Sequence, residues 1–141
     1  MRIAALYVIA AAVLVPPAHG AAPNMREGEW EITMKMEMPG MPMAMPPQVM
    51  QRCITNKELA DPQKPVPGAQ PGDSRCKTTD HKMQGNTATW KMACEDGTTG
   101  SGTATYSNTS YTSTITMMQG GQPPAMTMHQ SGRHLGSCKK P

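Results

Sequence analysis

The sequence contains no phenylalanine, and aromatic residues make up only 4% of its 141 residues. A chain with so few large rings must fill its core with other side chains. Methionine is the available substitute, with 15 copies. Because the methionine side chain is flexible and polarizable, such a core is filled but loosely specified. We therefore expect covalent cross-links to supply part of the stability.

Several chemical motifs are also missing. There is no C-x-x-C, which argues against a redox-active dithiol or a zinc ribbon, and no G-x-S-x-G serine elbow. The glycines at 97–102 lack the lysine and following helix of a phosphate-binding loop. From Ala21 on, 12 basic residues against 10 acidic ones leave a net charge of about +2, and the basic residues are scattered. We expect no enzyme and no nucleic-acid binding.

Residues 1–20 are typical of a secretory signal peptide. Arg2 supplies the positive charge, Ile3–Val15 the apolar stretch, and Ala18-His19-Gly20 a cleavage site of small residues. The apolar stretch is too short for a stable membrane span; an uncleaved anchor is the alternative. The prediction is a periplasmic or secreted protein, a mature domain of residues 21–141, and no membrane span after cleavage.

Export decides how the cysteines are interpreted. Cys53, Cys76, Cys94 and Cys138 form an even set in the mature chain, so two disulfides are expected in an oxidising compartment. Three connectivities are possible. We favour Cys53–Cys76, which would close a long Pro/Gly-rich loop at residues 56–75, and Cys94–Cys138, which would tie down the C-terminus.

The best-patterned stretch is Gly28–Met38. Trp30, Ile32 and the methionines at 34, 36 and 38 alternate with polar residues, as in a strand with one buried face. We expect these methionines in the core and the glutamates at 29, 31 and 37 on a solvated face. The Met-Pro segment that follows, residues 39–47, keeps apolar residues but carries prolines that cannot donate to a sheet.

Further strands are expected at 77–84, 87–94, 102–107, 110–118 and 125–133, with one helical turn at 56–61 capped by Asn56. Residues 48–55 are expected to form either a strand or one helical turn. The clearest hairpin turns at Gly85-Asn86. A two-residue turn places His81 and Met83 on the face of Trp90, whereas a three-residue turn places Cys76 opposite Cys94. Both registers remain open.

Short strands separated by turns predict an all-β domain. We expect a small antiparallel meander sheet or open barrel of about six or seven strands, stapled by disulfides, with Trp30 and Trp90 on the inward face. A sandwich is the alternative.

The order of motifs resembles one family. A signal peptide precedes GEWEITMKMEMPGMP at Gly28–Pro42, CIT at Cys53–Thr55, CKTTD at Cys76–Asp80, GNTATWKMAC at Gly85–Cys94 and SGRHLGSC at Ser131–Cys138. This is similar to the secreted bacterial family known as domain of unknown function 3617. The resemblance implies a periplasmic or envelope location, and it implies no activity, substrate or catalytic residue.

Two binding hypotheses remain beside a purely structural role. Thioether sulfur suits Cu(I), and the candidate ligands are Met41, Met43 and Met45, with Met126, Met128 and His129 as a second group. The other hypothesis is a hydrophobic ligand, or a protein partner, held by a methionine-lined face. A binding or structural protein without a cofactor is the first choice, and Cu(I) handling is the alternative.

Overall fold

The computed structural model describes residues 22–41, 45–61, 75–120 and 122–139. The predicted signal peptide, and part of both the Met-Pro segment and the Pro/Gly-rich loop, lie outside these ranges. The described elements are listed in chain order: β1 (Gly28–Glu37), β2 (Gln48–Ile54), α1 (Asn56–Leu59), β3 (Cys76–Gln84), β4 (Thr87–Cys94), β5 (Thr99–Tyr106), β6 (Ser110–Gln119) and β7 (Gln122–Gly136).

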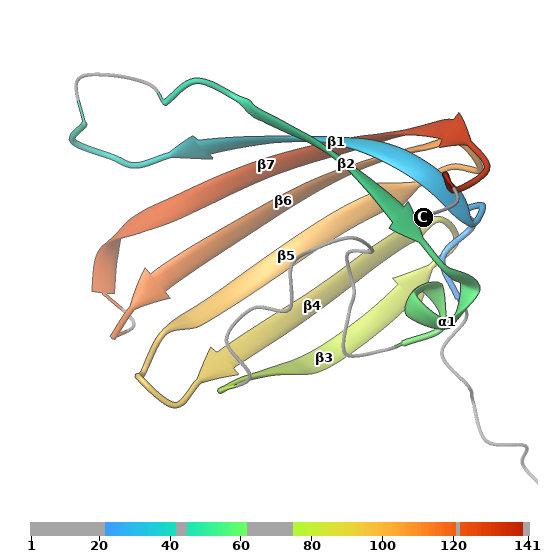
Figure 1. The fold of residues 1–141 in the computed structure, drawn as a ribbon. Coiled ribbons are helices and arrows are strands. Elements are labelled where there is room, and N and C mark those ends of the chain that lie inside the picture. Colours follow the sequence, from blue (N-terminus) through green and yellow to red (C-terminus); the bar gives the residue numbers. More distant parts are fainter. Residues whose placement is uncertain (1–21, 42–44, 62–74, 121, 140–141) are drawn as a thin grey trace, which may run out of the picture.

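All seven strands belong to one antiparallel sheet with the order β2-β1-β7-β6-β5-β4-β3 (Figure 1). Strands β3 to β7 form a meander, in which each strand pairs with the next one along the chain. The β1–β2 hairpin adds to the far side of β7. The predicted all-β class is confirmed.

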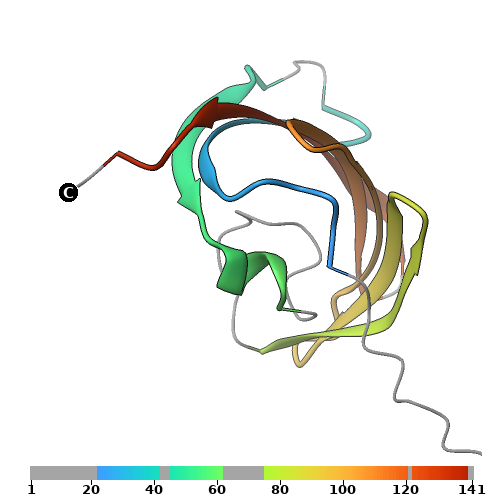
Figure 2. The ribbon, with the colours of Figure 1, turned by 90° about the vertical axis from the view of Figure 1, so that its right-hand side faces the viewer.

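The sheet curls into an open barrel, which the end-on view shows as an arc (Figure 2). The strand order ends at β2 and β3, so these are the two edges. α1 lies near the opening between them. The single curled sheet matches the predicted meander or open barrel rather than the alternative sandwich.

The core lies on the concave face. Trp30 and Trp90 both point inward as predicted, with exposed fractions of 0% and 3%. Two aromatic rings lie directly over glycines of the neighbouring strand: Trp90 opposite Gly102, and Tyr111 opposite Gly132. A Cβ added at Gly132 would lie 2.0 Å from Tyr111 Cε1. These glycines leave the space that the rings occupy.

The β3–β4 hairpin contains both of the registers that the sequence left open. Next to the turn, Gln84 pairs with Thr87, as in a two-residue turn, whereas Cys76 pairs with Cys94 further along. A β-bulge between Thr79 and Lys82 makes the change, and Asp80 there adopts a positive φ of 51°. Because the bulge adds one residue to β3, the pairing shifts by one.

The bulge explains why the favoured disulfide pairing is wrong. The disulfides are Cys76–Cys94 and Cys53–Cys138. Cys76 lies directly opposite Cys94 across the hairpin, with a Cα–Cα distance of 3.9 Å. Glu29 of β1 pairs with both Cys53 and Gly136, so the chain after β7 reaches Cys53, and the Cα–Cα distance of Cys53 and Cys138 is 5.3 Å.

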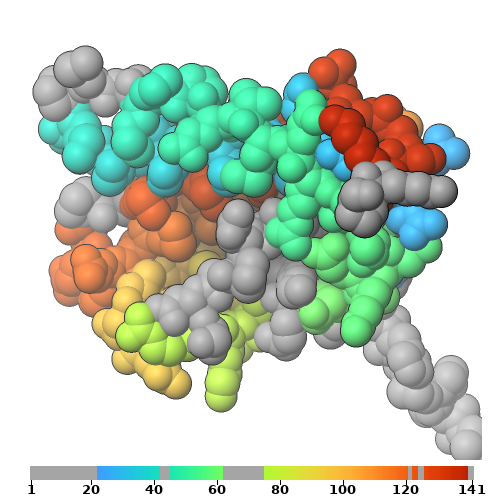
Figure 3. All heavy atoms as spheres, viewed as in Figure 1, coloured from blue at the N-terminus to red at the C-terminus, as the bar shows by residue number. Residues whose placement is uncertain are grey.

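The helical turn after β2 is present, but Thr55 rather than Asn56 is its N-cap. The Thr55 hydroxyl accepts from the Glu58 backbone N–H, and the Glu58 carboxylate accepts from the Thr55 backbone N–H at 3.2 Å. This reciprocal capping box holds α1 at the end of β2. In the space-filling view, β2 runs across this side of the molecule to α1 (Figure 3).

Candidate functional site

The concave face has two differently built ends, because alternate residues of each strand point inward. The aromatic end, on the right in Figure 1, is formed by Trp30, Tyr106 and Tyr111 and lies near α1. The methionine end lies at the opposite end of the same strands. Its inward residues are Met36, Met92, Met117, Met126 and Met128.

The aromatic end is tightly packed. The Trp30 and Tyr111 ring centroids are 5.9 Å apart, and those of Tyr106 and Tyr111 are 6.3 Å apart. Each of the three residues is at most 2% exposed. Burial raises the pKa of both phenols above the ordinary tyrosine value, so both stay neutral at physiological pH.

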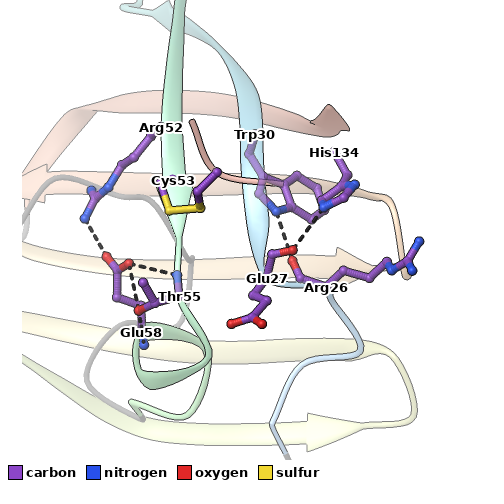
Figure 4. Close-up of a disulfide and its surroundings, with 9 residues drawn as sticks. Arg26, Glu27, Trp30, Arg52, Cys53, Thr55, Glu58 and His134 are labelled. Carbon is purple, nitrogen blue, oxygen red and sulfur yellow. Dashed lines mark hydrogen bonds and ion pairs between the residues drawn. A yellow bond between two sulfur atoms is a disulfide. The ribbon is translucent and has the colours of Figure 1, made fainter. Parts of the chain in front are cut away.

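Hydrogen bonds to the chain before β1 fix the aromatic end (Figure 4). Trp30 Nε1–H donates to the Arg26 carbonyl at 3.0 Å. His134, in edge contact with the Trp30 ring at a centroid distance of 5.4 Å, has Nε2 3.0 Å from the Glu27 carbonyl. Because a carbonyl oxygen can only accept a hydrogen bond, the imidazole nitrogen that faces it, Nε2, is the one that bears the hydrogen. His134 therefore has a structural role here.

A hollow of about 830 Å³ lies beside this end, bordered by Arg26, Thr55, His134 and Cys138. The Arg52–Glu58 ion pair lies nearby and joins β2 to α1 (Figure 4). Backbone, charged and polar groups all line the hollow, and the Cys53–Cys138 disulfide and the ion pair hold the surrounding elements together. We assign it no catalytic role, since its histidine is already held by the Glu27 carbonyl.

The methionine end is only half-buried. Met36 lies directly opposite Met128 in the β1–β7 pair, and Met117 lies opposite Met126 in the β6–β7 pair. Met92 packs across Gly100, where a Cβ would lie 2.9 Å from Met92 Cγ. Methionines from four strands thus share one surface. Their thioethers are available for packing, for an apolar ligand or for a soft metal.

Between the two ends lies a polar pair that the sequence reasoning did not identify as a site. Ser113 and Gln130 face each other across β6 and β7, and each is 4% exposed. Ser113 Oγ and Gln130 Oε1 have no hydrogen-bond partner among the described residues. A signal was present in the sequence, since Ser113 occupies an inward position between Tyr111 and Ile115.

The predicted metal ligands are only partly brought together. Met126 and Met128 point inward, whereas His129 lies on the convex face, with Nε2 3.7 Å from the Glu37 carboxylate. Met41 is 58% exposed and Met45 is half-buried, while Met43 lies outside the described residues. β1 nevertheless ends, and β2 begins, at the methionine end (Figure 1). The metal assignment stays a prediction.

Rows of threonines cover the convex face. Thr89, Thr103 and Thr114 lie on successive strands and border a hollow of about 350 Å³ together with Lys82 and Lys91. The carboxylate of Glu31 pairs with Arg133 at 2.8 Å on the same face. Among the described residues, no three His, Cys, Asp or Glu side chains are grouped to hold a metal ion.

Comparison with known proteins gives a family but no function. No curated protein and no solved structure matches the chain. No helix in the described part of the chain is long and apolar enough to cross a membrane. The model of one family matches residues 25–138, from the buried Met25 to the last cysteine. The chain therefore belongs to the family described as protein of unknown function (DUF3617).

Proposed function

We propose that this is an exported, non-enzymatic binding protein that holds an apolar ligand against the methionine end of its concave face. The observation that carries the proposal is the half-buried state of the methionines there. A surface that served only as core would be sealed, as the aromatic end is. Large exposed or half-exposed apolar surfaces in a folded domain commonly mark interaction sites.

The chemistry of this surface suits an apolar ligand of variable shape. Among the described residues, the inward positions around Met36, Met117 and Met128 are Ile115, Gly102 and Trp90, none of them charged. Methionine can change its rotamer to fit different partners at small cost. Curvature of the sheet lets several strands contact one ligand at the same time.

Other features support export and the lack of catalysis. Two disulfides are typical of an oxidising compartment. The histidines are dispersed, with His81 on edge strand β3, His129 on the convex face and His134 held at the aromatic end. Among the described residues, the His129–Glu37 pair lies on the convex face, so it is not placed beside a ligand on the concave face.

The test is a fluorescence titration of the disulfide-intact mature protein with 1-N-phenylnaphthylamine, which emits strongly in apolar surroundings. We expect saturable binding to the wild type. Met128→Asn should weaken it by at least about fivefold, because burying an amide against the probe is unfavourable. Thr127→Asn is the matched control on the opposite face, and its affinity should equal the wild type. No saturable binding, or equal losses in both variants, would exclude the proposal.

A second candidate function is Cu(I) binding, and one observation favours it. Directly opposite residues of an antiparallel pair have Cβ atoms about 4.5–5.5 Å apart, closer than successive inward residues of one strand. Met36 and Met128 satisfy this relation, as do Met117 and Met126. Two such pairs from three neighbouring strands could converge on one soft ion.

Copper is tested by a Cu(I) competition titration with three leucine variants. Met36→Leu/Met128→Leu removes one opposed pair, and a second variant changes Met41, Met43 and Met45. Met118→Leu, on the outward side of β6, is the control. Leucine keeps volume and apolarity, so folding should survive. Loss of affinity in either of the first two variants alone supports ligation. A wild type no better than a scrambled methionine-containing peptide would end the copper hypothesis.

A further inference from the structure

The polar pair in the middle of the concave face needs an explanation. Ser113 and Gln130 are directly opposite one another, and both are about as buried as the aromatic core. Buried polar atoms in folded proteins are nearly always hydrogen-bonded, because an unpaired one keeps the full cost of leaving water. Ser113 Oγ and Gln130 Oε1 lack a partner among the described residues.

The residues directly opposite the pair on the flanking strands are apolar and cannot supply the missing bonds. Gln130 lies opposite Met34 on β1, and Ser113 lies opposite Ala104 on β5. Along the strands, the next inward residues are Tyr111 and Ile115 on β6. Two polar atoms are therefore set into an apolar wall, at the border between the aromatic end and the methionine end.

We propose that Ser113 and Gln130 bind the polar group of the ligand that the methionine end holds, and that this group is a neutral hydroxyl. The inference rests on the proposed function and specifies its ligand class. The ligand O–H donates to Gln130 Oε1, and the Ser113 hydroxyl donates to the ligand oxygen. A hydroxyl is a small neutral group that donates one hydrogen bond and accepts another, as these two atoms require.

Charge considerations exclude an ionised group. A buried ion needs an opposite charge beside it. Among the described inward residues, the nearest arginine or lysine by strand position is Arg52 on β2, three strands from Ser113 and already paired with the Glu58 carboxylate. Tyr106 and Tyr111 stay neutral because burial raises the pKa of both phenols. An alcohol fits this site better than a carboxylate or an amine does.

The position of the pair also orients the ligand. From Ser113 to Met117 along β6 is four residues, or roughly 13 Å at ~3.3 Å per residue. The aromatic end is filled by packed rings, so the apolar chain extends toward Met117, Met126 and Met128. The ligand class is thus a medium-length aliphatic alcohol, with its hydroxyl at the pair and its chain along the methionines.

The experiment compares two isomeric probes, decan-1-ol and 1-methoxynonane, which differ in that the ether lacks the donor. Each displaces 1-N-phenylnaphthylamine from the mature protein. We expect the wild type to prefer the alcohol by about fivefold, the effect of one net hydrogen bond. The double variant Ser113→Ala/Gln130→Met should lose the preference and keep its affinity for the ether. Thr112→Ala, on the opposite face of β6, should behave as the wild type.

The outcomes separate this inference from the proposed function. If both probes bind equally to the wild type, or if the double variant keeps the preference, the polar pair has no part in recognition, while the apolar site stands. If neither probe displaces the dye and the dye itself does not bind, the apolar site fails first. Thermal unfolding of the double variant checks its fold: we expect it to be at least as stable as the wild type, because two unpaired buried polar atoms are removed. A less stable double variant would show that the pair is satisfied within the protein, and would overturn the inference.

Discussion

The two ends of the concave face are made by the same strands, yet they solve the packing problem differently. At the aromatic end, the Tyr111 ring lies over Gly132, and Trp30 donates a hydrogen bond to the Arg26 carbonyl before β1. At the methionine end, unbranched side chains pack against the edge of the core and stay half-buried. The difference teaches that one sheet can be tightly packed at one end and only half-buried at the other, where we propose that the ligand binds.

The elements around the aromatic end are also more constrained than those around the methionine end. α1 with its capping box and the Cys53–Cys138 disulfide lie at the aromatic end (Figure 4). The methionine end has the shorter Cys76–Cys94 cross-link. We therefore expect substitutions at the aromatic end to cost stability, and substitutions at the methionine end to change binding.

The largest expected effect is that of Trp30→Ala. The ring is fully buried and its N–H is bonded to the Arg26 carbonyl, so its removal should reduce the free energy of unfolding by about 3–5 kcal/mol. Trp30→Phe keeps most of the packing and should lose clearly less. Denaturant unfolding followed by circular dichroism measures both. A near-neutral Trp30→Ala would mean that the aromatic end does not specify the fold.

Removal of a disulfide should have the next largest effect on stability, and the two bonds allow the two ends of the concave face to be compared. The two bonds span 85 and 18 residues. On the loop-entropy model, removing the longer one costs roughly 4.5 kcal/mol and the shorter one roughly 3 kcal/mol. Serine pairs at 53/138 and at 76/94, each with the other bond intact, give the values by denaturant unfolding. A larger loss for the 76/94 pair would place the main covalent constraint at the methionine end.

Alkaline pH should weaken the aromatic end selectively. Because burial raises the pKa of Tyr106 and Tyr111, the folded state keeps protons that the unfolded state releases above pH 10. Their contribution is therefore complete below pH 10 and declines above it, by up to about 1.4 kcal/mol per pH unit for each tyrosine. Unfolding curves between pH 8 and 11 measure the decline.

The double variant Tyr106→Phe/Tyr111→Phe is the control, since it keeps both rings without the ionisable groups. Its unfolding free energy should change less with pH over the same range. An identical decline in the variant would assign the alkaline effect to other groups, such as the lysines.

The smallest expected effect is at the methionine end. Met36→Ala removes a half-buried side chain and should cost about 1 kcal/mol, since only part of its surface is withdrawn from water. Ile32→Ala, two inward positions earlier on β1, should cost about 2–5 kcal/mol because Ile32 is fully buried. Equal costs, measured by denaturant unfolding, would remove the distinction between the two ends.

The strands were predictable because their alternation is strong, as in Trp30, Ile32 and Met34 against Glu31 and Thr33. The inward faces of Trp30 and Trp90 follow from the same rule. Alternation also implies that the His129 side chain points to the other face of the sheet from Met126 and Met128. The prediction that these three residues form one ligand group did not take this into account. The last strand begins earlier than predicted, at Gln122, because its prolines lie where β7 has few partners.

The disulfide pairing and the polar pair could not be predicted from the pattern of any one strand, because both depend on the register between strands. Pairing depends on the bulge at Asp80, a one-residue shift that leaves no mark in the hydrophobic pattern. The Ser113–Gln130 pair depends on β6 and β7 being neighbours in a given register. The pattern within one strand specifies the buried face, while contacts between strands specify the site.

The sheet order has a consequence for how the chain folds. Strands β3 to β7 pair with sequence neighbours, and such local contacts form quickly. β1 instead pairs with β7, so that Met36 meets Met128 across most of the chain. β1, the first strand in the chain, can pair with β2 early, but it can pair with its second neighbour, β7, only after the whole chain is available. Formation of the Cys53–Cys138 bond, which needs β2, β1 and the segment after β7 in place, therefore reports that folding is complete.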